Sequence, residues 1–166
     1  MSSLRSLLKF QAWANAELLE ALGGLDANEH AATLTSCLRT FNHIHVVDRI
    51  FQAHLQGLPH EFTDTNTPQT LGLAEFGRSV RSVDEWYVDY AGRLAQEQLS
   101  QRLSFRFTDG DLGCMNRGEM LLHVVAHGAY HRGAIGERLD AAGKAPPREL
   151  LTRFLHRTEP DRREGV

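Results

Sequence analysis

Apolar residues recur every three to four positions along four long stretches of the chain, a spacing typical of helices that bury one face. In the first stretch the repeat includes Leu4, Leu8 and Leu19, and the glycines at 23 and 24 end it. We therefore predict four long amphipathic helices and one short helix near the C-terminus. Their expected ranges are 3–22; a start between 29 and 36 with an end at 56; a start at 70 or 71 with an end between 98 and 101; 117 or 118 to 142; and 148–156.

Two segments break the helical spacing. Residues 58–68 are rich in Pro, Thr, Asp and Asn, which predicts a long loop. In residues 102–107 apolar and polar side chains alternate as on a half-buried strand, and a turn signal at 108–111 leads into a second extended piece at 112–115. The whole pattern predicts an all-α fold: an up-down four-helix bundle with a small β-hairpin before the fourth long helix.

Length and charge restrict the kinds of protein this chain can be. Its 166 residues fit one domain, which we expect over 1–158, with a polar, frayed tail at 159–166. The net charge of −3 excludes a globally basic nucleic-acid binder. No apolar run reaches the roughly 18 residues of a membrane-spanning helix. The first residues lack the apolar core and cleavage site of a signal peptide, so we expect a cytoplasmic protein without nucleic-acid or membrane partners.

Histidine is the unusual component of the composition, with nine residues. His123, His127 and His131 are spaced four apart, so on a helix successive rings differ by only about 40° and all three project from one face. Two histidines four apart can grip one divalent ion, as in HExxH zinc sites. The intervening Glu of that motif is absent here, which excludes a metalloprotease of this type. The two cysteines are far apart and support neither a disulfide framework nor a thiolate zinc cage.

A third ligand has to come from a facing helix, and the second helix offers His43 and His45. These two lie about 200° apart around the helix axis, so they cannot both face one ion, and periodicity does not choose between them. A three-histidine site with an open position is typical of catalytic metal sites. Neutral imidazoles suit zinc, nickel, copper or ferrous iron. His123 is either a neighbour of the ligands or a core residue. The remaining histidines, at 30, 54, 60 and 156, are interpreted as ordinary residues.

Several short motifs follow one another along nearly the whole chain, and their order and spacing are more informative than any one of them. They are the run Phe10-Gln11-Ala12-Trp13-Ala14-Asn15, the pair Asn42-His43 followed by Asp48, the hairpin turn Asp109-Gly110, His127 with the run His131-Arg132-Gly133, and the ending from Gly143 to Pro147.

With these motifs the sequence resembles the DinB-like superfamily, which includes the YfiT-like thiol transferases. The resemblance implies a four-helix bundle with a divalent metal site of one histidine from the second helix and two from the fourth. These would be His43, His127 and His131, so the resemblance favours His43 over His45. It implies a divalent metal ion as cofactor, most often zinc or nickel, with iron or manganese as further options. It also implies a homodimer.

From the motifs and the resemblance we expect a metal-dependent enzyme that acts on a small molecule. The metal would bind a low-molecular-weight thiol, lower its pKa and present the thiolate to an electrophile, giving thiol S-transfer or thiol-dependent isomerisation. Arg132 or Tyr130 is expected to orient the substrate. The alternatives are a metal-dependent hydrolase, a non-enzymatic metal-binding or stress-response protein, and a bundle whose histidines are only structural.

Overall fold

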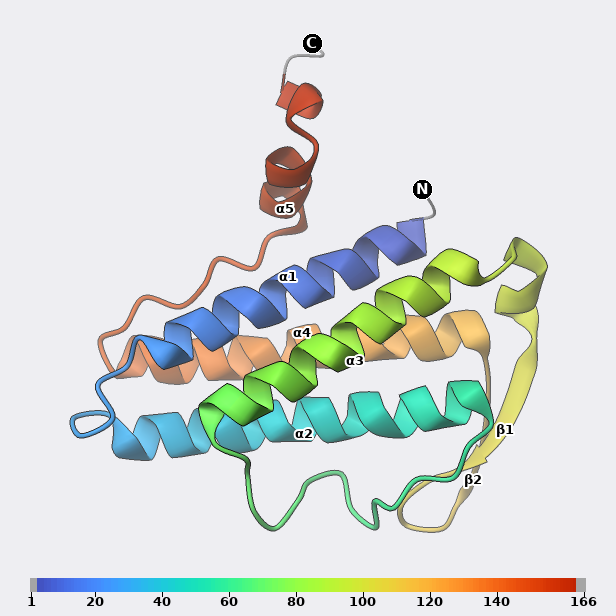
Figure 1. The fold of residues 1–166 in the computed structure, drawn as a ribbon, viewed down its shortest axis with the longest axis horizontal. Coiled ribbons are helices and arrows are strands. Elements are labelled where there is room, and N and C mark those ends of the chain that lie inside the picture. The colour runs from blue at the N-terminus through green and yellow to red at the C-terminus, as the bar shows by residue number, and fades with distance from the viewer. Residues whose placement is uncertain (1–2, 164–166) are drawn as a thin grey trace.

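A computed structural model describes residues 3–163 of the chain. Four long helices form the body of the molecule, and a hairpin and a short C-terminal helix are added to it (Figure 1). The elements in order are α1 (Ser3–Gly23), α2 (Ala31–Gln56), α3 (Leu73–Arg93), a 3₁₀ helix (Gln96–Ser100), β1 (Arg102–Arg106), β2 (Leu112–Asn116), α4 (Arg117–Ala141), α5 (Leu151–Thr158) and a last 3₁₀ turn (Pro160–Arg163).

The helix bounds agree with the apolar spacing except at the end of α3. This helix ends at Arg93, five or more residues before the predicted end, because Leu94 and Ala95 adopt extended backbone. Leu94 in the extended link and Leu99 in the following 3₁₀ helix still pack against the core. Their side chains continue the apolar spacing beyond the helix, which explains why the predicted helix was too long.

The helix directions differ from the predicted up-down order. Where α2 and α3 are in contact, the residue numbers increase in the same direction along both helices. The His45 ring contacts Ser79, and further along the Tyr87 hydroxyl donates to the Asp48 carbonyl. The two helices therefore run parallel, while α1 and α4 run the opposite way (Figure 1). The loop between α2 and α3 has 16 residues, enough at about 3.3 Å per residue to return along a helix of about 39 Å. The predicted all-α bundle with a hairpin before α4 is confirmed, and this long connection lets α2 and α3 run parallel within it.

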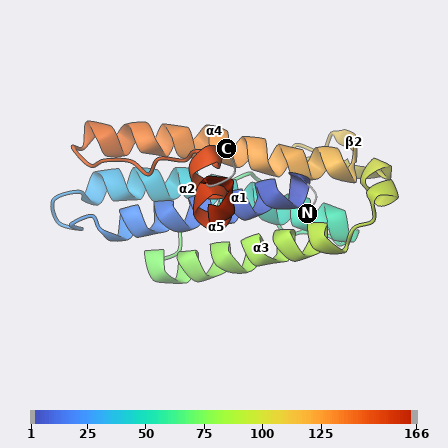
Figure 2. The ribbon, with the colours of Figure 1, turned by 90° about the horizontal axis from the view of Figure 1, so that it is seen from above.

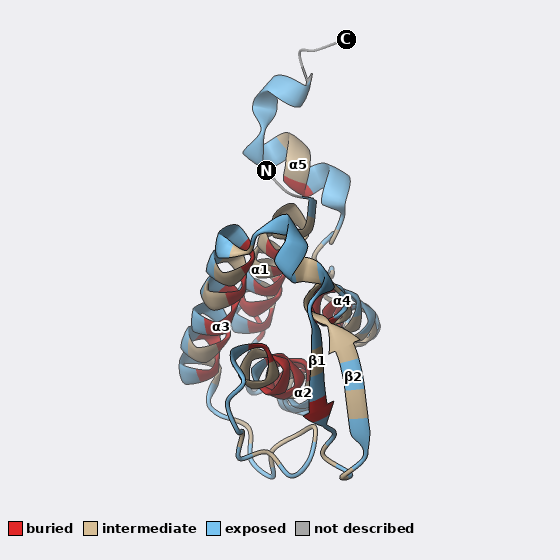
Figure 3. Ribbon diagram, turned by 90° about the vertical axis from the view of Figure 1, so that its right-hand side faces the viewer, coloured by how far each residue is buried: buried red, intermediate tan, exposed pale blue. Residues whose placement is uncertain are grey.

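The hairpin lies beside α2 and α4 (Figure 3). β1 and β2 pair antiparallel, with Arg102 opposite Asn116 and Phe105 opposite Gly113. Phe105 is the buried residue of β1, and its ring lies 5.9 Å from that of Phe51 on α2. The hairpin is therefore attached to the bundle by an aromatic side chain.

The buried apolar residues form two clusters, and a polar layer lies between them. One cluster gathers around Phe51, Tyr87 and Val124, the other around Phe41 and Phe76. The polar layer consists of five buried residues that occupy the intermediate positions of the four long helices: Gln11, Asn15, Asp48, Asp84 and Arg132.

Hydrogen bonds join the members of the polar layer. The Asn15 side-chain amide donates to both carboxylate oxygens of Asp84, at 3.0 and 3.1 Å, and its carbonyl oxygen accepts from the Arg132 guanidinium at 2.9 Å. The Gln11 amide donates to Asp48 at 3.4 Å. Each of these polar residues, costly to bury alone, thus has a partner from another helix, while the Gln11 Oε1 and Asp48 Oδ1 atoms have none within residues 3–163.

The segment after α4 crosses to α1, and α5 projects from that side of the bundle (Figure 2). Phe154 is buried against Phe10 and Trp13 of α1, with ring centroids 5.9 and 5.8 Å away. The predicted frayed tail is partly ordered, because Pro160–Arg163 forms a 3₁₀ turn; residues 164–166 lie outside the described residues. Within 3–163, every helix is too short or too polar to span a bilayer.

Candidate metal centre

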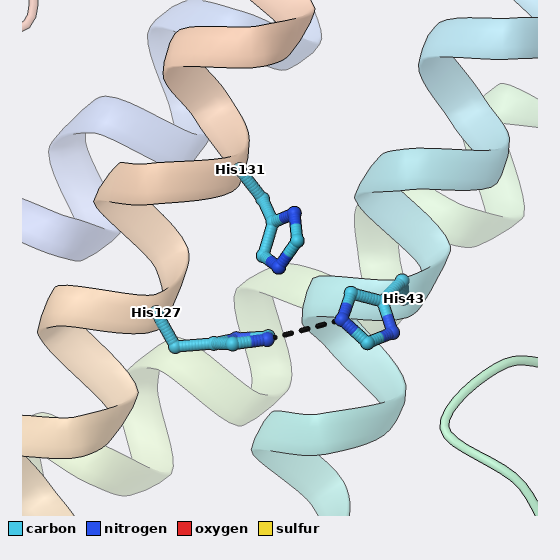
Figure 4. Close-up of side chains that lie close together, drawn as sticks. All are labelled: His43, His127 and His131. Atoms are coloured by element: carbon cyan, nitrogen blue, oxygen red, sulfur yellow. Dashed lines mark hydrogen bonds between the residues drawn. The ribbon is translucent and has the colours of Figure 1, made fainter.

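His43, His127 and His131 come together on the side of the bundle where α2 faces α4 (Figure 4). One nitrogen from each ring lies within 4.8 Å of the other two. The Nε2 atoms of His43 and His127 are 3.1 Å apart, and the His43 and His131 rings lie 4.6 Å apart between centroids. All three residues are partly buried. The predicted residues therefore converge as one cluster.

Helix geometry produces this convergence. On α4 the four-residue spacing places His127 and His131 one turn apart on the same face, with ring centroids 4.5 Å apart. His43 reaches them from α2, which runs antiparallel to α4. His45 lies on another side of α2, buried against α3, where its Nε2 is 2.8 Å from the Ser79 hydroxyl. Burial lowers the pKa of His45 to about 4, with a smaller effect of Arg49, so this ring is a neutral core residue.

The loop between α2 and α3 fixes the tautomer of His43. The Nδ1 of His43 is 2.8 Å from the carbonyl oxygen of Thr65. A carbonyl oxygen only accepts, so in the neutral imidazole Nδ1 carries the ring proton and Nε2 presents a lone pair towards α4. A backbone carbonyl in this position is a usual partner of a metal-binding imidazole.

Asn42 holds that loop in place. Its side-chain amide donates to Asn66 at 2.5 Å and to the Thr67 hydroxyl at 2.7 Å. The Asn66 amide in turn donates to the Arg39 carbonyl at 3.1 Å. The residue before the histidine thus anchors the segment whose carbonyl orients the histidine. Sequence reasoning missed Thr65, because a backbone carbonyl carries no residue-specific signal.

The surroundings of His127 strongly lower its pKa. Burial is the largest cause, and together with the neighbouring His131, His43, His123 and Arg132 it lowers the pKa of His127 to about 3. The pKa of His131 is also lowered, first by burial and then by His43. Both rings are therefore neutral near pH 7, as a metal ligand requires.

The protons on these rings fit metal binding. Because Nδ1 of His43 is protonated, the proton shared between the two facing Nε2 atoms belongs to His127. The Nδ1 of His127 is buried and has no hydrogen-bond partner among residues 3–163, so it can take that proton when Nε2 binds an ion. Two nitrogens of a tetrahedral zinc site are about 3.3 Å apart, close to the 3.1 Å separation here. The three imidazoles thus fit a divalent transition metal.

Arg132 has a different place from the one expected. Its guanidinium forms an ion pair with Glu149 at 2.5 and 2.8 Å and donates to Asn15, and its side chain is 2% exposed. A side chain on Gly128 would meet this guanidinium at 2.7 Å, so the glycine makes room for it. Arg132 thus joins α4 to α1 and to the segment before α5, and its expected role in orienting the substrate stays a prediction.

Tyr130 and His123 border the cluster. Tyr130 is 77% exposed and its ring lies edge-on to His131 at 5.0 Å. His123 stacks on Phe51 at 4.7 Å and on His127 at 5.5 Å. His123 therefore supports the position of the His127 ring, one of the two roles that the sequence left open for it.

The fold and the site together define the class of protein: a helical bundle with a candidate metal centre of three imidazoles between two of its helices. A sequence model of the DinB family matches residues 1–163, and the chain belongs to the DinB family. It is similar to Protein DinB of Bacillus subtilis (strain 168), with 25% identity over an alignment 166 positions long that covers 92% of this chain and 95% of that protein.

Proposed function

We propose that this DinB family protein binds a divalent metal ion through His43, His127 and His131 and uses it in an enzymatic reaction of a small-molecule thiol. The observation that carries the proposal is the 3.1 Å approach of two imidazole Nε2 atoms from different helices, one of them with its tautomer fixed by Thr65. Three imidazoles leave at least one position of the ion open. Zinc and nickel are the metals we favour, with iron and manganese as further candidates. We place this activity in the cytoplasm.

The proposed chemistry is transfer of a thiol sulfur to an electrophilic small molecule. An ion at the cluster would stabilise the thiolate of a coordinated thiol over the neutral thiol. The thiol proton passes to solvent, and the sulfur forms a bond to an electrophilic carbon. The leaving group departs with the electron pair of the bond that it held. In the isomerisation variant the sulfur adds reversibly to a double bond, and its departure restores the double bond in the other geometry.

Metal content tests the site. Untagged protein, purified without chelator, is expected to hold a stoichiometric divalent metal by elemental analysis. Single changes His43→Ala, His127→Ala and His131→Ala should each remove it. His45→Ala is the matched control on α2, and it should retain the metal even if the fold is less stable. Loss of metal in His45→Ala but not in His43→Ala would overturn the ligand assignment.

Thiol binding tests the chemistry. We expect the visible spectrum of the cobalt-substituted protein to change on addition of glutathione or cysteine, as a sulfur ligand enters the metal site. A metal that binds while no thiol alters the spectrum would favour a non-enzymatic metal-binding protein. A spectrum unchanged by thiols, together with metal-dependent ester hydrolysis, would favour a hydrolase.

A further inference from the structure

A cavity of about 320 Å³ lies beside the histidine cluster, between α2, α4 and the hairpin. His43 and His127 form part of its wall. His54 lines it as well and is eleven residues beyond His43 on α2, about 16 Å along the helix axis. The cavity therefore extends from the candidate metal centre along α2 towards the hairpin.

The wall of this cavity consists mainly of aromatic and aliphatic side chains. Among the described residues that line it there is no Lys, Arg, Asp or Glu. Flat rings face one another there: Phe51 stacks on His123 at 4.7 Å, and Phe105 lies 4.8 Å from His54. Phe107 lines the cavity and is still 46% exposed, so a bound ring would cover apolar surface that water now contacts.

Two buried nitrogens at the hairpin end of the cavity have no partner in the described part of the chain. The Nε2 of His54 is buried and forms no hydrogen bond within residues 3–163. The His60 ring lies 5.1 Å from the His54 ring between centroids, and the Nδ1 of His60 is also buried without a partner among these residues. A buried nitrogen without a partner costs free energy that a ligand hydroxyl or carbonyl can recover. The interpretation of His54 as an ordinary residue is therefore incomplete, because this side chain forms part of the cavity wall.

We propose that the cavity binds the electrophilic substrate, and that this substrate is an uncharged compound with one or two flat rings and a single hydroxyl or carbonyl group. The volume is near the lower end of the range of about 300–1,000 Å³ for small-molecule sites. The absence of charged lining residues disfavours a carboxylate or ammonium group within the cavity. The proposal rests on the proposed function only in naming the ligand an electrophile. A charged thiol would then approach the cluster from the side away from the cavity.

The test uses three matched naphthalene ligands and the full-length protein after treatment with a chelator. Removing metal first is necessary because a carboxylate could ligate an ion at the cluster. We expect 2-naphthalenemethanol to bind at least tenfold more tightly than 2-naphthoate by calorimetry. His54→Phe should weaken the alcohol and leave 2-methylnaphthalene unchanged, because the ring shape stays and the nitrogen is lost.

A second comparison fills the cavity. Met115 lines it from β2, whereas Leu112 on the same strand is 77% exposed and does not line it. We expect Met115→Trp to weaken the alcohol at least tenfold and Leu112→Trp to leave it within twofold. In case Met115→Trp does not fold, the imidazole NMR signals of the wild-type protein decide. Those of His54 and His123 should shift with the ligand, and that of His156 on α5, which does not line the cavity, should not.

Several outcomes would overturn the proposal: no binding of the alcohol up to its solubility, equal affinity for 2-naphthoate, unchanged binding in a folded Met115→Trp variant, or unshifted His54 and His123 signals. The metal is absent from all these measurements. Failure of the cavity is therefore distinguished from failure of the metal centre, which shows instead as missing metal in untreated protein.

Discussion

A single amide illustrates how function is built at the scale of the residue. Asn42 does not face the histidine cluster, yet its hydrogen bonds to Asn66 and Thr67 bring the Thr65 carbonyl to His43. This arrangement explains why an asparagine stands directly before the histidine. The pair was visible in the sequence, but its partner carbonyl was not, since any residue type supplies one.

We predict that Asn42→Ala weakens metal binding about 10- to 100-fold, the usual effect of losing a group that orients a metal-binding imidazole. The affinity can be measured by competition with a chromogenic chelator. Thr35→Ala, an exposed change on the same helix, is the control and should leave the affinity unchanged. Wild-type affinity in a folded Asn42→Ala variant would contradict the positioning role.

Asp84 gives a prediction for pH. Burial raises its pKa to about 7, although the Asn15 hydrogen bonds and Arg132 act to lower it. Between pH 4 and 7 the folded state thus holds a proton that the unfolded state has released, so this group makes the free energy of unfolding fall as pH rises. Asp84→Asn cannot release a proton. Its stability relative to wild type should therefore increase through this window, by up to about 1.4 kcal/mol per pH unit.

Urea denaturation at several pH values, on both proteins without metal, measures this difference. Asp48 is present in both proteins and is a second carboxyl whose pKa is raised by burial, with a further effect of Asp84. Parallel stability curves for wild type and Asp84→Asn would show that Asp84 is ionised in the folded protein throughout this range.

At the scale of the element, the hairpin depends on the absence of a side chain at Gly113. A Cβ there would lie 2.6 Å from the ring of Phe105, its partner across the strands. We predict that Gly113→Ala displaces Phe105 and lowers the free energy of unfolding by about 1–3 kcal/mol, as for other overpacked sites. Chemical denaturation measures the loss. Gly133→Ala is the control, since nothing lies within 4 Å of its Cβ and alanine favours the helix.

Elements were easier to predict than their directions. The ranges of α1, α2 and α4 follow from apolar spacing because each is bounded by glycine, a loop or a cap, such as the Asn116–Glu119 capping box of α4. The end of α3 and the parallel course of α2 and α3 depend on contacts with other parts of the chain. The partners of Arg132 were not predictable for a related reason: adjacency to His131 in sequence means a rotation of about 100° on a helix.

At the scale of the whole molecule, a bound ion would link α2 to α4. An ion that binds only the folded state stabilises it by about 2.7 kcal/mol at a hundredfold excess over Kd. For a domain of this size we therefore predict that zinc or nickel raises Tm by about 5–10 °C in a thermal melt. Magnesium, which prefers oxygen ligands, is the control and should have no effect. An unchanged Tm with zinc and nickel would argue against the metal centre.

The homodimer implied by the family resemblance stays a prediction. From Leu122 to Gly133 the exposed residues of α4 are apolar, with Leu122 51% and Tyr130 77% exposed, and we predict that this part of the helix forms the interface. Leu122→Glu should then reduce the mass measured by light scattering from dimer to monomer. Leu112→Glu, at an even more exposed apolar position on β2, should not. A wild-type chain that is monomeric at every concentration would contradict the prediction.

The polar layer between the two apolar clusters has a consequence for how the chain selects one alignment of its helices. Apolar side chains alone would tolerate a shift of one helix past another by a turn, because leucine can replace leucine at each level. Such a shift here would place Asp84 or Arg132 against aliphatic side chains, without Asn15 or Glu149 to receive them. Leaving a buried charge unpaired costs about 3–5 kcal/mol. The layer thus fixes the axial alignment of the helices, and with it the positions of the α2 and α4 histidines relative to each other.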